Sequence, residues 1–407
     1  MLTLSTRTHY TTLLDAETLR QPDDRPAIIY LSVEDAPITV SRADFARSIT
    51  AYGAALRGMG IASRDLVIIA HTQNLESIFA FWGALLIGAI PSMFPTLTEK
   101  LDPDIYMANM TELVARSGVR AVLTTDDFAP ALADRVGCAV YGSDALLASL
   151  DGAADFAPAA PDVDEVAFLQ HSSGTTGLQK GVALAHRAVL NQLASYSAAL
   201  ALKSDDVIVS WLPLYHDMGL IAGFLMPLVQ GIPLVLMSPF EWAKSPAMLF
   251  RAIHDYRGTL CWLPNFAYNH CARRIRQRDL EGLSASSIRL FVNCSEPVYY
   301  ESHELFAERF AALGVTREML SVSYAMAENT FAVTQTPPGV LPHLDVIDRA
   351  ALQTDLRAVP VERDHPSAVI KVSCRMPIIQ RRACWIATGQ VLPDGASAKL
   401  PCRATAC

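Results

Sequence analysis

The sequence predicts an α/β fold in which helices cover both faces of a mostly parallel sheet. Short, fully apolar segments typical of buried strands alternate with segments whose apolar residues recur at helical spacing. Several of the strand-like segments run into polar residues at their ends. The chain has 407 residues, of which 51% are hydrophobic and 18% are charged. This composition argues against disorder, and the length favours roughly two to three structural units.

The N-terminal part predicts a hairpin followed by strand-helix units. Two short apolar segments, 28–33 and 37–40, favour the hairpin. Ser41, with Asp44 three residues later, resembles a capping box that opens a helix, and a glycine at position 58 or 60 is expected to end it. DLVIIAH then predicts a strand, the segment after Asn74 predicts a helix, and AVLTT predicts the next strand.

The second part continues this alternation. Residues 151–165 are rich in Ala, Pro and Asp, and we interpret them as a surface connection between two halves. Residues 185–200 predict a helix. The segments PLVLMSP, TLCWLPNFAY, IRLFVNCSEPV and SVSYAMAENT each indicate a strand that ends in polar residues. Because ligands of open α/β sheets bind at the carboxyl ends of strands, these ends predict one shared cleft.

Composition and patterning exclude several classes of function. The net charge is −8, and the longest basic cluster lies at 273–276, so nucleic acid is not expected as a partner. The apolar runs 78–94 and 219–237 contain prolines and glycines, and we interpret them as buried elements rather than membrane spans. No export signal and no C-x-x-C pair occur, so we expect a cytoplasmic protein whose eight cysteines are thiols.

The segment QHSSGTTGLQKGV, residues 170–182, indicates phosphate binding. Glycines let backbone N–H groups approach an anion, hydroxyl groups add short hydrogen bonds, and a lysine supplies a positive charge. We expect this loop to connect a strand directly to the helix of residues 185–200. The match to the nucleotide-binding G-x-x-x-x-G-K-[ST] loop is poor, because Gln179 precedes the lysine and Gly181 follows it. A polar loop that only turns the chain remains the alternative.

His216 and Asp217 form a polar pair in an apolar context, at an expected junction of strand and helix. Burying such groups without partners costs a few kcal/mol. They are therefore expected to be solvated, mutually satisfied or functional. One interpretation is a helix cap by Asp217, and the other is a role in a site.

The order QHSSGTTGLQKGV, WLPLYHDMGL, PNFAY, NCSEPV and SYAMAENT closely resembles the adenylate-forming enzymes, the superfamily of acyl-CoA synthetases, luciferases and nonribosomal-peptide adenylation domains. LPLYHDMGLI, MSP, PNFAY and SEPV look most like the fatty acyl-AMP ligases. The resemblance covers roughly residues 20–373. It implies the large N-terminal domain of these enzymes, an α/β structure with two sheet-and-helix halves and the start of a small β subdomain.

The resemblance also implies an activity and its cofactors. Such ligases activate a fatty acid with ATP and Mg²⁺, and pass the acyl group to the thiol of an acyl carrier protein, with coenzyme A as the alternative acceptor. The fatty acid carboxylate attacks the α-phosphorus, so positioning and charge neutralisation supply the rate. Catalytic roles fall on Lys180 and on His216, near the acyl carboxylate. Thr176 and Glu328 are expected at the metal.

ATP contacts are implied for Ser173, Gly174, Thr175, Thr176, Gly177 and Lys180 in the loop, and for Glu296, Pro297, Tyr324, Ala325 and Met326 around the adenine. Three features of these motifs differ from the family pattern. Ala325 stands where glycine is usual, and Ala327 stands where many members have threonine. Cys294 and Ser295 replace the usual small pair before the predicted adenine segment. Neither alanine excludes ATP.

The family resemblance suggests domain boundaries. Residues 1–373 form the expected large domain, with halves at about 1–160 and 161–335. Residues 331–371 fit the insertion of the fatty acyl-AMP ligases, although a variable surface loop is the alternative.

Residues 374–407 form a divergent tail in which segments that fit the family alternate with segments that do not. Small reading-frame changes would produce this pattern, and so would genuine divergence. No T-G-D segment, hinge motif or C-terminal lysine motif occurs, so we expect the C-terminal lid domain to be absent.

Several functions remain open. The first is a fatty acyl-AMP ligase that serves a carrier protein. The alternatives are a catalytically impaired remnant that only binds nucleotide or acyl chain, and an acyl-CoA synthetase. A phosphate-loop ATPase is disfavoured by Gln179 and Gly181.

Overall fold

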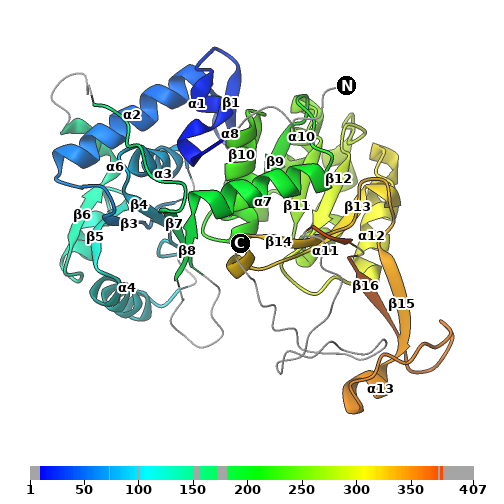
Figure 1. Cartoon of the computed structure of the whole chain (residues 1–407). Coiled ribbons are helices and arrows are strands. Elements are labelled where there is room, and N and C mark those ends of the chain that lie inside the picture. The colour runs from blue at the N-terminus through cyan, green and yellow to red at the C-terminus, as the bar shows by residue number, and fades with distance from the viewer. Residues whose placement is uncertain are drawn as a thin grey trace. The chain divides into compact units, whose positions relative to one another are not determined.

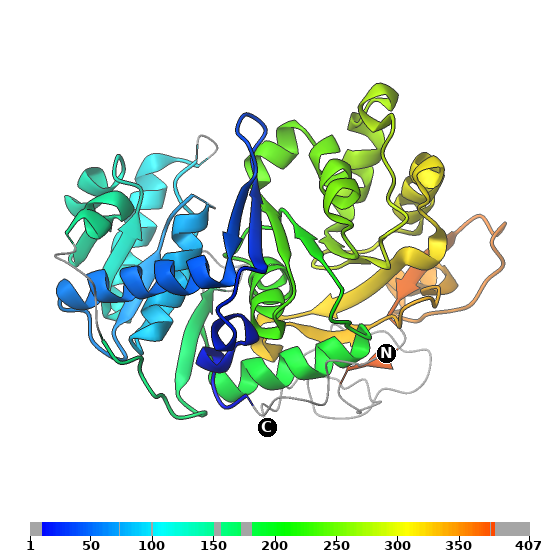
Figure 2. The ribbon, with the colours of Figure 1, turned by 90° about the horizontal axis from the view of Figure 1, so that it is seen from above.

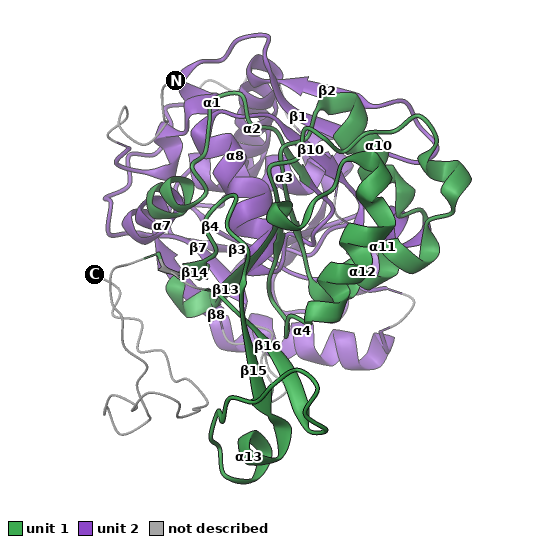
Figure 3. Ribbon diagram, turned by 90° about the vertical axis from the view of Figure 1, so that its right-hand side faces the viewer, with its two compact units in different colours: residues 1–5, 194–209, 245–407 green, residues 6–193, 210–244 purple. Residues whose placement is uncertain are grey.

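The computed structural model describes residues 10–72, 74–98, 101–149, 156–171, 181–374 and 376–378. The chain forms two compact units, which Figure 3 distinguishes by colour. Unit 1 takes residues 194–209 and the described chain from 245 onward, and unit 2 takes the described chain up to 193 together with 210–244. The predicted halves, about 1–160 and 161–335, are each continuous in sequence, whereas each observed unit is built from more than one segment of the chain. The boundaries of the halves therefore stay a prediction.

Unit 2 contains a four-stranded parallel sheet in the order β4-β3-β5-β6. Its strands are β3 (Leu66–Ile69), β4 (Ile90–Met93), β5 (Val119–Thr124) and β6 (Ala139–Gly142). All four residues of β3 are buried, as expected for a central strand that is covered on both faces. Unit 2 therefore has the parallel α/β arrangement that the sequence predicts.

The other strands of unit 2 are β1 (Pro26–Leu31), β2 (Ile38–Ser41), β7 (Val166–His171), β8 (Gly181–Ala185) and β10 (Leu234–Met237). The predicted early hairpin is confirmed, because β1 and β2 pair antiparallel, while β10 lies parallel to β1.

The expectation for the loop after His171 was wrong. The loop does not connect a strand directly to a helix, because β7 pairs antiparallel with β8, which precedes α7. A strand as short as the five residues GVALA shows no periodicity that would distinguish it in the sequence.

The helices of unit 2 are η2 (Leu13–Asp15), α1 (Glu17–Arg20), α2 (Arg42–Gly58), α3 (Leu75–Leu86), α4 (Pro103–Ser117), α5 (Ala129–Ala133), α6 (Ser143–Ala148), η3 (Met218–Leu225), α8 (Met226–Gln230) and α9 (Pro239–Lys244). The helix α7 (His186–Ala199) begins in unit 2 and ends in unit 1. The capping box of Ser41 and Asp44 is present, and the Ser41 side chain accepts a hydrogen bond from the Asp44 N–H group.

Helices α2 and α3 pack closely against each other in unit 2 (Figure 2). Gly83 permits this approach, because a Cβ atom there would lie 2.6 Å from the Tyr52 Cβ. The apolar run 78–94 is accounted for by α3 and β4, and the run 219–237 by η3, α8 and β10. Within the described ranges, no helix combines the length and the apolar character that crossing a membrane requires.

Unit 1 is organised around parallel strands with an antiparallel edge. Its strands are β9 (Ile208–Ser210, the last residue of which belongs to unit 2), β11 (Leu260–Leu263), β12 (Leu290–Asn293), β13 (Leu320–Ala325), β14 (Ala332–Gln335) and β17 (Met376–Pro377). Strands β9, β11, β12 and β13 are parallel neighbours in this order, and β14 and β17 continue antiparallel. The polar ends of β11, β12 and β13 therefore meet at one sheet edge.

The helices of unit 1 are α10 (Ala247–Tyr256), α11 (Asn265–Arg274), η4 (Gln277–Leu280), α12 (Tyr300–Phe310), η5 (Ala311–Leu313), η6 (Arg317–Met319), η7 (Ala327–Asn329) and α13 (Arg349–Thr354). Its core contains an aromatic cluster in which Phe250, Phe306 and Phe310 have ring centroids 4.3 to 6.1 Å apart. β15 (His343–Asp348) and β16 (Ala368–Ser373) form an antiparallel ribbon that carries α13 (Figure 1). The ribbon and α13 occupy much of residues 331–371, and the assignment of this segment to an insertion stays a prediction.

Candidate functional site

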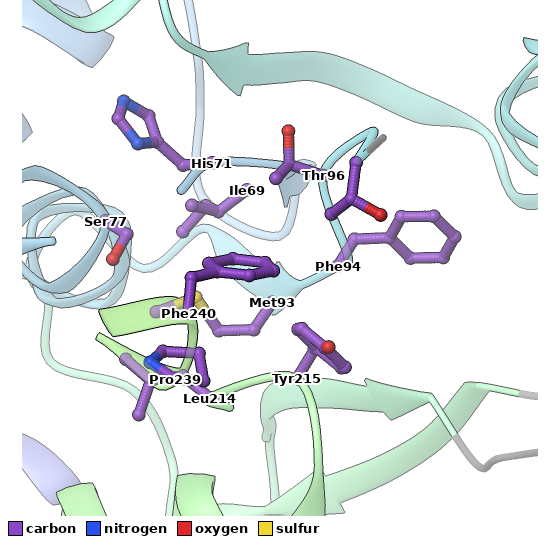
Figure 4. A pocket seen from close by; sticks show the side chains of 11 residues that line it. Ile69, His71, Ser77, Met93, Phe94, Thr96, Leu214, Tyr215, Pro239 and Phe240 are labelled. Atoms are coloured by element: carbon purple, nitrogen blue, oxygen red, sulfur yellow. The ribbon is translucent and has the colours of Figure 1, made fainter. Parts of the chain in front are cut away.

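Unit 2 contains a pocket with a larger lobe of about 540 Å³ and a smaller adjoining lobe of about 30 Å³. Most of the lining is apolar. The larger lobe is lined by Phe94, Pro95, Thr96, Thr98, Leu101, Asp102, Ile105, Tyr106, Asn109, Leu113, Tyr215, His216 and Phe240. Figure 4 shows the smaller lobe, with His71 toward one end, Tyr215 toward the other and Phe240 and Met93 between them.

One wall of the pocket is the first part of α4, and capping sets its position. Asp102 Oδ1 accepts hydrogen bonds from the N–H groups of Asp104 at 2.9 Å and Ile105 at 3.1 Å, which satisfies two free donors at the start of the helix. The Tyr106 hydroxyl donates to the Pro95 carbonyl at 3.0 Å and so ties α4 to the segment after β4. Leu101 and Ile105 remain 44% and 62% exposed, so an apolar surface surrounds this part of the pocket.

The opposite wall comes from the segment between β9 and η3, which carries Tyr215 and His216. Asp217 Oδ1 accepts a hydrogen bond from the Met218 N–H group at 2.8 Å, so the predicted cap is present. Gly219 allows η3 to fold tightly under this segment, because a Cβ atom there would lie 2.2 Å from the Pro213 carbonyl oxygen. Of the polar pair, Asp217 therefore caps the helix, and His216 lines the pocket.

His216 is a polar group at the surface of this pocket. Its side chain is exposed, yet the surrounding apolar side chains disfavour the charged form and lower the pKa of the imidazole. The ring of Tyr215 lies beside it, with centroids 4.6 Å apart. An apolar pocket that includes a neutral histidine can accept a long apolar chain with a polar head.

The predicted phosphate-binding residues Ser173, Gly174, Thr175, Thr176, Gly177 and Lys180 lie outside the described residues. The structure does describe both ends of this loop, at His171 and Gly181. His171 is buried, and its Nδ1 lies 2.9 Å from Ser92 Oγ on β4. Burial lowers the pKa of His171 to about 4, so the ring is neutral at neutral pH. Sequence reasoning did not identify this histidine, because its partner is 79 residues away.

In unit 1, the residues that the resemblance assigns to the adenine lie at the ends of β12 and β13. Glu296 and Pro297 follow β12 and are exposed, and the Glu296 carboxylate accepts a hydrogen bond from the Phe266 N–H group in the first turn of α11. Tyr324 is 40% exposed near the end of β13, and Glu328 is exposed in η7. Ala325 and Met326 between them are partly buried.

A buried polar network at the same sheet edge was missed. Asn265 and Asn293 are 4% and 0% exposed, and Asn293 Nδ2 donates to Asn265 Oδ1 at 3.1 Å. Asn293 Nδ2 also lies 3.0 Å from His303 Nε2, and burial lowers the pKa of His303 to about 4. The available signal was the position of each asparagine at the end of an apolar segment, in LCWLPN and LFVN. Among the described residues, no cluster of three or more His, Cys, Asp or Glu side chains could hold a metal ion.

A comparison with protein families now identifies the chain. The profile described as AMP-binding enzyme matches residues 14–366, which is most of the chain. The chain belongs to the AMP-binding enzyme family. The resemblance to the adenylate-forming enzymes is therefore confirmed, while the roles of the individual site residues stay predictions.

Curated relatives of this AMP-binding enzyme include ligases of fatty acids. It is 35% identical over 222 residues to the medium-chain-fatty-acid acyl-carrier-protein ligase JamA of Moorena producens, which covers 54% of this chain and 37% of the relative. It is 29% identical over 346 residues to a long-chain-fatty-acid AMP ligase of Mycolicibacterium smegmatis, covering 81% of this chain and 54% of the relative. The chain spans about half the length of the curated relatives that it matches.

Solved structures show the same fold. A fatty acid AMP ligase from Legionella pneumophila superposes with a TM-score of 0.84 at 27% identity, covering 93% of this chain and 66% of that one. A fatty acyl-adenylate ligase from the same organism, in complex with acyl adenylate and pyrophosphate, gives a TM-score of 0.82 at 28% identity, covering 93% and 65%. The predicted α/β fold, that of the large N-terminal domain of adenylate-forming enzymes, is confirmed.

Proposed function

We propose that this AMP-binding enzyme activates a fatty acid with ATP to an acyl-adenylate, which a carrier-protein thiol then accepts. The observation that carries the proposal is the apolar pocket of about 540 Å³ with His216 in its lining. Small-molecule sites typically have volumes of about 300–1,000 Å³ and a few polar groups in an apolar wall. The names of the relatives and the family match support the same chemistry.

In this proposal the pocket of unit 2 holds the acyl chain, and the residues that the resemblance assigns to the adenine belong to unit 1. A carboxylate oxygen attacks the α-phosphorus of ATP, the acyl O–P bond forms and pyrophosphate leaves. A neutral His216 does not form an ion pair with the fatty acid carboxylate, so the nucleophile keeps its reactivity. Lys180 is expected to neutralise charge on the leaving phosphates.

Mg²⁺ is proposed as the metal of this reaction, held by Glu328 and Thr176. The exposed carboxylate of Glu328, just beyond the end of β13, is the hard oxygen ligand that Mg²⁺ prefers. When bound, the ion neutralises phosphate charge. An acyl carrier protein is the proposed acceptor, with coenzyme A as the alternative, and the cytoplasmic location stays a prediction.

Hydroxamate trapping of the acyl-adenylate tests this function. The purified chain is incubated with ATP, Mg²⁺ and a fatty acid, and Glu328→Ala is compared with Glu281→Ala, a change at another exposed glutamate of unit 1. We expect hydroxamate from the wild type and from Glu281→Ala, and at least a ~10²-fold loss in Glu328→Ala. A folded chain that binds ATP without forming hydroxamate would support the alternative of a remnant that only binds.

A series of saturated fatty acids tests the pocket itself. Each added methylene is worth about 0.8 kcal/mol when it is buried, or about fourfold in affinity. We expect the dissociation constant to fall by this factor per carbon until the pocket is filled. Affinity that does not depend on chain length would contradict acyl binding in this pocket. Transfer of the acyl group from the adenylate to a carrier protein or to coenzyme A then distinguishes the two acceptors.

A further inference from the structure

We propose that Asn265 is a positioning residue for the nucleotide, because its side chain sets the conformation of the loop 294–299. This loop contains Glu296 and Pro297, which the resemblance places beside the adenine. The inference rests on the proposed function and adds a residue to which the resemblance assigns no role. Asn265 is the first residue of α11 and is 4% exposed.

The sheet register brings Asn265 to the loop. Strands β11 and β12 are parallel neighbours in which Leu263 pairs with Asn293. Two residues after Leu263 the chain enters α11, and directly after Asn293 it enters the loop that leads to α12. The start of α11 and the start of the loop are therefore held side by side by the backbone ladder.

The side-chain oxygen of Asn265 holds both ends of the loop. Asn265 Oδ1 accepts a hydrogen bond from Asn293 Nδ2 at 3.1 Å, just before the loop, and another from the Tyr299 N–H group at 3.0 Å, at its end. The side-chain nitrogen of Asn265 donates to Ser302 Oγ at 3.1 Å in α12. One amide thus connects β12, the end of the loop and α12.

The middle of the loop is held by the next residue of α11. The Glu296 carboxylate accepts a hydrogen bond from the Phe266 N–H group, where the helix dipole favours a negative charge. Ser295 beside it has a φ angle of 74°, a left-handed conformation that a serine adopts only when its surroundings impose it. The hydrogen bonds of Asn293, Glu296 and Tyr299 to this helix start all involve Asn265 or Phe266. The backbone of Cys294 is held separately, because its N–H group donates to the Leu263 carbonyl at 3.3 Å.

Removal of the Asn265 amide would leave the Asn293 side chain and the Tyr299 N–H group without this acceptor. The loop would then be free to relax from its left-handed conformation at Ser295. Because the loop is expected to border the adenine, the loss should appear in the binding of adenosine compounds. Binding of the fatty acid alone should not change, since the pocket that we assign to it lies within unit 2.

The test compares Asn265→Ala with Asn269→Ala. Asn269 lies one turn later in α11, and its side-chain nitrogen donates to the same Ser302 Oγ at 2.9 Å and to the Asn265 carbonyl at 3.5 Å, neither of which belongs to the loop. Calorimetry measures the affinities of the full chain for ATP with Mg²⁺, for a dodecanoyl-sulfamoyl-adenosine and for dodecanoate. We expect Asn265→Ala to weaken both adenosine ligands at least tenfold and to leave dodecanoate within twofold, whereas Asn269→Ala leaves all three within twofold.

A second variant distinguishes the loss of this hydrogen-bond acceptor from a general loss of folding. Asn265→Asp keeps the acceptor oxygen for Asn293 and Tyr299, and Ser302 can donate to its second oxygen. On a logarithmic scale, Asn265→Asp should recover at least half of the affinity for the adenosine ligands that Asn265→Ala loses. Unchanged adenosine binding in Asn265→Ala, or an equal loss of dodecanoate binding, would overturn the inference alone. A wild-type chain that binds no adenosine ligand would instead contradict the proposed function, and the inference with it.

Discussion

His171 Nδ1 lies 2.9 Å from Ser92 Oγ, and the same hydroxyl donates to the Leu169 carbonyl at 3.0 Å. When the serine proton is used for the carbonyl, the Nδ1–H tautomer of the neutral His171 ring donates to the serine oxygen. Ser92 thus links β4 to β7 at the residue where the predicted phosphate-binding loop begins. The orientation of this ring is set by a strand that is distant in the sequence.

Ser92→Ala tests this link. The change removes the acceptor of a buried N–H group and one donor to a carbonyl, so we expect the free energy of unfolding to fall by about 1–3 kcal/mol. Ser63→Ala is the matched control, because Ser63 is exposed and makes a long hydrogen bond of 3.4 Å. Its effect should stay within about 0.5 kcal/mol. Equal effects of the two changes in urea titrations would contradict a structural role for Ser92.

Stability should fall in mild acid because of buried histidines. Burial lowers the pKa of His171, His186 and His303 to about 4, whereas in the unfolded chain each titrates near ~6.5. Their contribution is therefore complete above about pH 6.5 and is lost as the pH falls from there to about 4. We expect each to cost roughly 2 kcal/mol at pH 5 relative to pH 7.5.

His186→Gln isolates one of these groups. His186 Nδ1 accepts a hydrogen bond from the Leu13 N–H group at 3.1 Å, and a glutamine can offer an oxygen in its place without titrating. The difference in unfolding free energy between pH 7.5 and pH 5 should shrink in this variant. A difference as large as that of the wild type would show that His186 does not contribute to acid sensitivity.

Gly219→Ala should disturb the wall of the pocket. The added methyl group would lie 2.2 Å from the Pro213 carbonyl oxygen, a backbone atom that cannot move aside easily. We expect at least roughly 2 kcal/mol of destabilisation and weaker binding of fatty acid. At Gly137 a Cβ atom would meet nothing within 4 Å, so Gly137→Ala serves as the control in thermal unfolding. A neutral Gly219→Ala would mean that η3 can shift without cost.

Ile105→Asp tests the apolar surface of the larger lobe. The side chain of Ile105 is 62% exposed and lies in the first turn of α4, where a carboxylate is favourable for the helix dipole. Folding should therefore be preserved, while a charge beside the acyl chain should raise the dissociation constant of dodecanoate at least about tenfold. Leu356→Asp, at a side chain that is 63% exposed in unit 1, should leave binding unchanged. Equal affinities in the two variants would place the acyl chain elsewhere.

Much of the fold could be predicted because its signals are local. The capping box of Ser41 and Asp44 and the strand-helix alternation depend on residues a few positions apart, and all were confirmed. The loop after His171 was assigned to the wrong connection, because the short strand β8 is recognisable only through its pairing with β7. Of the site, His216 was identified from its unusual polarity, and the structure places it in the pocket.

The sequence by itself determined the fold class, the family and the residue types available for the chemistry. Periodicity and capping depend on residues that are close together in the sequence, and the family depends on the order of the motifs. Tertiary structure alone decided which distant groups meet. The pairing of Asn265 with Asn293 follows from the register of β11 and β12, and that of His171 with Ser92 joins β7 to β4. It also decided the protonation of the buried histidines, because a pKa depends on how much water the fold removes from the ring.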